Sequence, residues 1–124
     1  MSQKIAVIAG ENRIIIELNN TKTAKAVAQA APFTATANTW GDEIYFRIPV
    51  RLDLENGREV VERGDVGYWP PGSAMCLFFG PTPASRGNEI RPASAVSVFG
   101  KIIGDLGVLR QVKDGNRLQV TLVE

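Results

Sequence analysis

Residues 64–79, GDVGYWPPGSAMCLFF, decide the fold class of this chain. Gly64-Asp65 is a turn pair that leads into the strand-forming residues Val66 to Trp69. Pro70-Pro71-Gly72 predicts a stiff turn, and Met75 to Phe79 is a continuous apolar run of the length of a buried strand. Two short strands separated by a tight turn are typical of a mainly-β protein.

Strand signals continue from this stretch toward both ends of the chain. Most are runs of β-branched or alternating apolar residues bounded by Gly, Asn, Asp or Pro. Two short helices are expected, one capped by Asn20 or Thr21 and stopped by Pro32, and one over 105–112. Seven or eight short strands close into a barrel or a sandwich, because closure removes exposed strand edges. The predicted strands cover residues 5–9, 14–18, 43–48, 66–69, 75–79, 95–103 with a bulge at Gly100, and 118–122. An extended stretch is expected at 33–39, and a strand pair in 51–62 around Asn56-Gly57.

The composition is that of an ordinary folded protein, and it argues against several kinds of partner. The chain has 124 residues, 44% hydrophobic and 22% charged, which predicts a single domain over 1–124. A net charge of +1, with bases and acids mixed, predicts no nucleic-acid and no membrane partner. No stretch approaches the ~20 apolar residues of a membrane span, and the run Ile5 to Ala9 is too short for a signal-peptide core. With Cys76 as the single cysteine, we expect a cytoplasmic protein.

Histidine is absent from the chain. This excludes Ser-His-Asp and Cys-His nucleophilic catalysis, histidine-bound zinc, and the usual acid–base group near neutral pH. The chain also contains no phosphate-binding glycine loop and no metal-binding spacing of carboxylates, and Asp65 after Gly64 is simply a turn residue. We therefore expect no cofactor and no bound metal.

Four segments together resemble a known family. They are NTWGDEIYF at 38–46, GDVGYWPPG at 64–72, LFFG at 77–80 and PASAV at 92–96. These segments are similar to those of the small bacterial and archaeal cyclophilin-like family, and AVSVFGKI at 95–102 resembles the C-terminal part of cyclophilins. The resemblance covers most of the chain. It implies a prokaryotic protein with a closed, flattened, eight-stranded β-barrel and one or two short helices.

The resemblance does not extend to the catalytic residues of true cyclophilins, and a fold does not by itself carry an activity. Those enzymes have a strand similar to Phe-His-Arg, a Gln-Gly-Gly motif and an aromatic wall that holds the proline. This chain has no histidine, and none of its glutamines precedes a Gly-Gly pair. Arg47 is the one residue that resembles the catalytic arginine, and it is the candidate catalytic residue.

Four aromatic residues form the most function-like set in the chain: Trp40, Tyr45, Tyr68 and Trp69. Tyrosine and tryptophan combine a large apolar face with a polar tip, which suits a ligand groove. The alternative is a barrel mouth filled by aromatic side chains, or a homodimer contact.

The strand predicted at 43–48 places Glu43, Tyr45 and Arg47 on one face, opposite an apolar face. One interpretation is a surface ion pair between Glu43 and Arg47, which contributes little to stability. The other is a polar rim that orients a peptide or a small acid. Cys76, within an apolar run, predicts a buried structural cysteine rather than a nucleophile.

These observations predict a binding domain whose aromatic groove, edged by Glu43 and Arg47, takes a peptide or small-molecule ligand. The first alternative is a weak peptidyl-prolyl isomerase that uses Arg47 as its hydrogen-bond donor. The second, which rests on the fold resemblance alone, is an accessory subunit of an enzyme complex that handles small cyclic amides or ureas.

Overall fold

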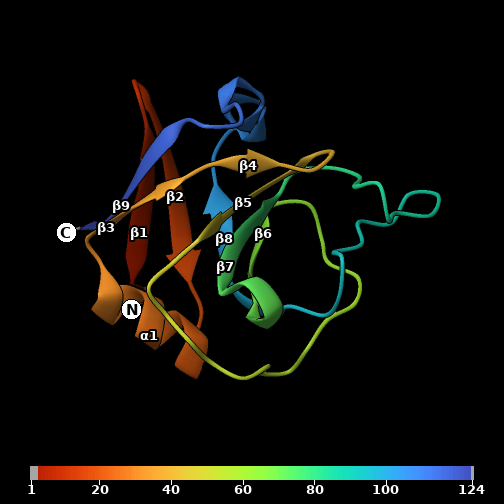
Figure 1. Ribbon diagram of the computed structural model, residues 1–124, viewed down its shortest axis with the longest axis horizontal. Coiled ribbons are helices and arrows are strands. Elements are labelled where there is room, and N and C mark those ends of the chain that lie inside the picture. The colour runs from red at the N-terminus through yellow and green to blue at the C-terminus, as the bar shows by residue number, and fades with distance from the viewer. Residues whose placement is uncertain (1–2, 124) are drawn as a thin grey trace.

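The chain folds into a β-barrel with short helices at its ends (Figure 1). The computed structural model describes residues 3–123. Over that range no helix is long and apolar enough to cross a membrane. In chain order the elements are β1 Lys4–Ala9, β2 Asn12–Leu18, α1 Lys22–Ala30, β3 Phe33–Thr36, β4 Asn38–Thr39, β5 Glu43–Arg47, β6 Asp65–Trp69, the 3-10 helix η1 Pro70–Gly72, β7 Ala74–Phe78, β8 Ser97–Ile103, the 3-10 helix η2 Leu106–Gln111, and β9 Arg117–Val123.

The sheet closes through the segment that contains β3 and β4. The strand order is β3-β9-β1-β2-β8-β6-β7-β5-β4, and each pair of neighbours is antiparallel. β3 pairs with β9 and β4 pairs with β5, although only Ala37 separates β3 from β4. The predicted mainly-β barrel is confirmed, with nine strands among residues 3–123 because the extended segment 33–39 is interrupted at Ala37. A bulge was predicted at Gly100, and the pairing of β6 with β8 shifts next to this residue. Val66 pairs with Gly100, whereas Gly67 pairs with Val98.

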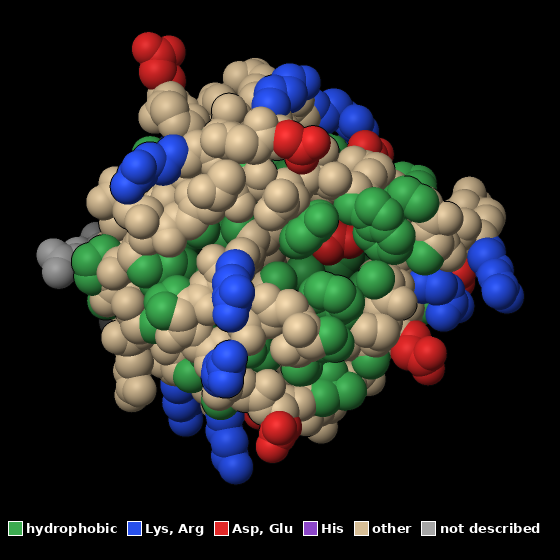
Figure 2. All heavy atoms as spheres, in the orientation of Figure 1, with side chains coloured by type: hydrophobic (Ala, Val, Ile, Leu, Met, Phe, Trp, Pro, Cys, Tyr) green, Lys and Arg blue, Asp and Glu red, His purple; other side chains and the backbone are tan. Residues whose placement is uncertain are grey.

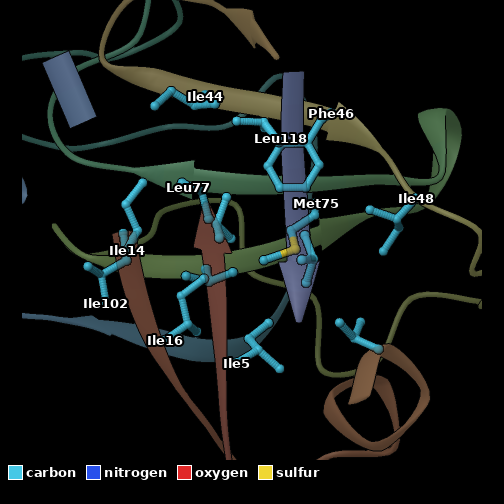
Figure 3. Close-up of a cluster of buried hydrophobic side chains, with 14 of the residues drawn as sticks. Ile5, Ile14, Ile16, Ile44, Phe46, Ile48, Met75, Leu77, Ile102 and Leu118 are labelled. Carbon is cyan, nitrogen blue, oxygen red and sulfur yellow. The ribbon is translucent and has the colours of Figure 1, made fainter. Parts of the chain in front are cut away.

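Alternate residues of the strands fill the barrel interior. On β5, Ile44 and Phe46 are buried in the main core, which also contains Met75 and Leu77 of β7. Figure 3 shows Phe46 and Met75 directed toward the side of the barrel that carries Ile5. This alternation turns the remaining side chains of β5 to the outer surface of the barrel.

The two ends of the barrel are covered by α1 and η2 (Figure 1). The predicted cap of α1 is confirmed, because the Thr21 side chain accepts a hydrogen bond from the Ala24 amide at 3.1 Å. Glu55 adds a second cap from a distant loop, accepting from Lys22 N at 3.1 Å, Thr23 N at 2.9 Å and Thr23 Oγ1 at 2.7 Å. The Thr23 hydroxyl and the two amides lower the pKa of Glu55. A polar loop residue thus fixes the helix that closes this end.

A second, smaller apolar cluster lies outside the barrel, on the outer face of β6 and β7. Arg58 and Val96 exchange backbone hydrogen bonds of 2.8 and 3.0 Å, and Val61 N donates to Ile90 O at 2.9 Å. These bonds hold the long loop between β7 and β8 over the outer face, so that β7 is buried on both sides as predicted. The buried members of this cluster are Val61, Ala74, Cys76, Phe78, Ile90 and Val96.

The strand pair predicted within 51–62 is wrong. Among the described residues this segment has only isolated β-bridges and no regular strand. Two of its backbone amides are bonded by side chains of the barrel: Leu52 N donates to Tyr68 Oη at 3.2 Å and Glu55 N donates to Ser97 Oγ at 2.7 Å. The segment is ordered by tertiary contacts, which a local turn signal cannot reveal.

Candidate ligand-binding pocket

The outer face of β5 begins the candidate site. Glu43 and Tyr45 of β5 lie outside the main core, as the alternation predicts, and they pair with Phe78 and Cys76 of β7. Trp40 precedes this strand and is held to it by a turn in which Trp40 N donates to Glu43 O at 2.9 Å and Glu43 N donates to Trp40 O at 3.2 Å. One short segment therefore brings two aromatic rings and a carboxyl group to the same place.

These side chains line a pocket of about 280 Å³. β6 contributes Trp69 and β7 contributes Cys76, and the loop between β7 and β8 contributes the remaining residues outside the segment of Trp40 and β5. Figure 2 shows hydrophobic side chains gathered around a hollow in which an acidic side chain is visible. The lining residues are Trp40, Glu43, Tyr45, Trp69, Cys76, Pro92, Ala93 and Val96.

The Trp69 ring is held in a fixed orientation. Its indole Nε1 donates a hydrogen bond of 2.6 Å to Ser94 Oγ in the long loop. Its other edge packs on Gly72, where an added Cβ would lie 2.8 Å from Trp69 Cζ3. The Trp69 ring can therefore lie against position 72 only because this residue is glycine. This explains why a glycine follows the two prolines. A ring fixed in this way loses little conformational entropy when it binds a ligand.

Glu43 is the unusual residue of the pocket. Its exposed fraction is 5%, and its Oε1 atom has no hydrogen-bond partner among the described residues. Burial raises the pKa of Glu43 from its ordinary value of 4.5 to about 7, and a hydrogen bond from the Cys76 side chain offsets part of this rise. A buried carboxyl with one oxygen left unpaired is costly to keep. Because its pKa lies near neutral pH, it can exchange a proton under ordinary conditions.

Cys76 is buried, as predicted. Burial raises the pKa of its thiol well above the ordinary value of 9.0, and the neighbouring Glu43 carboxyl raises it further. A thiol in this state is not a nucleophile, because the thiolate is the reactive form. Cys76 therefore serves the pocket as an apolar wall and as a neighbour of Glu43.

The grouping of Tyr68 with the other three aromatic residues is incorrect. Tyr68 follows the strand alternation to the opposite face from Trp69 and is 1% exposed within the main core. Its hydroxyl donates to Val50 O at 2.7 Å and accepts from Leu52 N at 3.2 Å. Tyr68 thus anchors the segment after β5 and does not line the aromatic pocket.

Arg47 also lies outside the aromatic pocket. It is exposed and lines a separate, open hollow of about 660 Å³ together with Arg51, Asp53 and Ser73. The predicted surface ion pair with Glu43 is not formed among the described residues, because Glu43 is buried and four positions along a strand span about 13 Å. Arg47 therefore does not edge the site that contains Glu43.

The other carboxylates near this site have partners of their own. Asp42 forms an ion pair with Arg110, with Nη1–Oδ1 and Nη2–Oδ2 distances of 3.1 and 3.3 Å. Asp65 accepts a hydrogen bond of 2.8 Å from Glu62 N, as expected of a turn residue, and lies 3.5 Å from Lys101 Nζ. No group of three or more His, Cys, Asp or Glu side chains within residues 3–123 is placed to hold a metal ion.

Sequence reasoning missed the contribution of the long loop. Pro92, Ala93 and Val96 line the pocket and Ser94 fixes the Trp69 ring, yet none was predicted as a site residue. The signal that points to them is their motif, PASAV at 92–96, which accompanies the tryptophan-containing segments in the family resemblance.

Comparisons with known proteins agree with the architecture. A family profile described as Cyclophilin-like matches residues 3–121. Among solved structures, the chain is similar to the solution structure of the hypothetical protein AF2241 from Archaeoglobus fulgidus, at 42% sequence identity and a TM-score of 0.82. That match covers 98% of this chain and 95% of the archaeal chain. A comparison with curated proteins gave no match.

Proposed function

The chain belongs to the cyclophilin-like family, and from this premise we propose that it is a binding protein that takes a small ligand, or one side chain of a peptide, in the aromatic pocket. Three fixed features support the proposal: the rings of Trp40, Tyr45 and Trp69, a wall supplied by a loop, and a buried polar group at Glu43. Ligand pockets typically combine an apolar lining with a few well-placed polar groups.

The single observation that carries the proposal is the unsatisfied Glu43 carboxyl inside this lining. A polar atom buried without a partner costs about 1–3 kcal/mol. Structural packing alone gives no reason to keep a carboxyl here, since a neutral apolar side chain would fill the same space without that cost. A ligand that bonds Glu43 supplies the reason.

The volume of the pocket limits the size of the ligand. At about 280 Å³ it lies just below the range of small-molecule sites, which is about 300–1,000 Å³. It matches a single ring or one side chain better than an extended peptide. A peptide ligand would place one residue in the pocket and run over the surface beside it.

The arrangement does not favour prolyl isomerisation. That reaction needs a donor placed at the amide nitrogen of a proline held by the pocket, and Arg47 lies outside the pocket lining. A protease-coupled isomerisation assay should show background rates for both the unchanged protein and Arg47→Ala. A rate above background that Arg47→Ala abolishes would instead support the isomerase.

Binding can be tested through the tryptophan signals, because both tryptophans of the chain line the pocket. Proline-containing peptides and a mixture of small metabolites are added to ¹⁵N-labelled protein, and the two indole N–H resonances are followed. Ligands should shift both resonances, and Trp40→Ala should remove binding. Leu122→Ala, which changes an exposed residue on β9, is the matched control and should bind normally. Shifts confined to other surfaces would contradict the proposal.

A further inference from the structure

We infer that the ligand of the aromatic pocket carries a protonated amine and places it against the Glu43 carboxylate. The inference rests on the proposed function and goes beyond it, because it names the chemical class of the ligand. It is carried by the position of one unpartnered acceptor among three aromatic rings.

The first argument concerns hydrogen bonding. An ionised carboxylate accepts hydrogen bonds and cannot donate them. Glu43 lines the pocket, and its buried Oε1 atom lacks a partner among the described residues, so the carboxyl group keeps an unused acceptor beside the ligand space. A ligand satisfies it by donating, and an ammonium is the strongest donor available, because charge-assisted bonds are roughly twice as strong as neutral ones.

The second argument concerns the surroundings of the carboxyl group. Trp40, Tyr45 and Trp69 line the same small space, and the negative faces of aromatic rings attract cations. No lysine or arginine is among the lining residues that the structure describes. The nearest arginine on the same strand, Arg47, belongs to the other hollow. The one formal charge that the described lining can carry is therefore the negative charge of Glu43, and no cationic side chain of the lining compensates it.

The third argument concerns charge neutralisation. The titratable groups that face Glu43 are Cys76 on β7 and Tyr45 on its own strand, while β6 and the long loop contribute only Trp69 and uncharged residues. In the empty pocket, burial keeps the Glu43 carboxyl partly protonated at neutral pH. An ammonium pairs only with the ionised form, so binding releases the proton. The affinity for an amine should therefore rise by about tenfold between pH 6 and pH 8, as the ionised fraction increases.

Three probes of matched shape test the inference: cyclohexylammonium, cyclohexanol and cyclohexanecarboxylate. Their dissociation constants are measured at pH 6 and pH 8 from tryptophan fluorescence and from the indole N–H shifts. The ammonium should bind more tightly than the alcohol at pH 8, with the rise described above. The carboxylate should bind least, and the affinity of the alcohol should change little with pH.

Glu43→Gln is the matching variant, because it keeps the size of the side chain and removes its charge. It should lower the affinity for cyclohexylammonium by about thirtyfold or more, which is the lower range for removing one partner of a buried charge pair. It should also abolish the pH dependence of the affinity for cyclohexylammonium, while cyclohexanol should still bind with unchanged affinity. Glu17→Gln, the same change at an exposed position on β2, should behave as the unchanged protein. Dispersed amide resonances will show that each variant is folded.

The outcomes separate this inference from the proposed function. Equal binding of the ammonium and the alcohol, unaffected by Glu43→Gln, would overturn the inference and leave an apolar binding pocket in place. Preference for the carboxylate would overturn it as well. Absence of binding by all three probes, together with failure of the peptide and metabolite test, would overturn both.

Discussion

Replacing Glu43 by glutamine should make the protein more stable at neutral and alkaline pH. The unfolded chain binds the Glu43 proton with an ordinary pKa of 4.5, and the folded protein binds it with a pKa of about 7. Between these values the folded state holds more protons than the unfolded state, so its stability falls as the pH rises. Glutamine has no proton to lose, and the variant avoids this decline.

The expected magnitude follows from the two pKa values. A rise from 4.5 to about 7 corresponds to about 3 kcal/mol, because each pH unit contributes about 1.4 kcal/mol. The full value applies because Glu43 is only 5% exposed and little screened by water. The free energy of unfolding of Glu43→Gln minus that of the unchanged protein should rise by about 3 kcal/mol from pH 4 to pH 8. The rise should occur between about pH 4.5 and pH 7 and then level off.

Urea denaturation followed by tryptophan fluorescence measures this difference. Taking the difference between two proteins at each pH removes the contributions of all other titrating groups. Glu17→Gln is the control, and its difference from the unchanged protein should stay flat over the same range, since Glu17 is exposed. A difference for Glu43→Gln that does not change between pH 4 and pH 8 would refute the reasoning, because it would mean that Glu43 ionises without penalty in the folded protein.

Three further predictions concern the parts of the structure that hold the pocket in place. Tyr68→Phe removes a hydroxyl that bonds two backbone groups of segment 50–52, and urea denaturation should show a loss of about 1–3 kcal/mol while ligand shifts at the indoles persist. Glu55→Ala removes the second cap of α1 and should lower the midpoint of urea denaturation. Since the pKa of Glu55 is lowered in the folded state, this deficit should be full above pH 4.5 and shrink as the pH falls further, and a deficit that is constant with pH would count against the capping role. Gly67→Ala brings a Cβ within 2.8 Å of Val96 Cγ2, and it should destabilise the protein by about 1–3 kcal/mol and displace the long loop, seen as changed amide shifts in 92–96.

Local patterns were sufficient for most of the fold. Alternation identified β5 and its inward and outward faces, the apolar run identified the buried β7, and Thr21 identified the start of α1. These features depend on side chains close in sequence, whose period and capping chemistry are visible without a structure. The strand pair predicted within 51–62 was wrong because this segment depends on residues distant in the sequence. Tyr68 and Ser97 accept hydrogen bonds from its backbone, and a local pattern cannot show such contacts.

The candidate site was only partly accessible from sequence. Trp40, Glu43, Tyr45 and Trp69 were predicted to belong together, and the structure brings all four to one pocket. Tyr68 was assigned to the same group because it is aromatic and adjacent to Trp69. Side chains alternate between the two faces of a strand, however, so Tyr68 points into the core. Consecutive residues on a strand are neighbours in the sequence, but their side chains lie on opposite faces of the sheet.

The sequence by itself determined most of the strands, the two faces of β5 and the exclusion of histidine-based catalysis, because these depend on residue types and on a period of two. Only the tertiary structure decided that the long loop lies over the outer face of the barrel and that Glu43 is buried in the pocket it lines. Burial results from contacts between segments distant in the chain, and burial rather than residue type places the pKa of this carboxyl near 7.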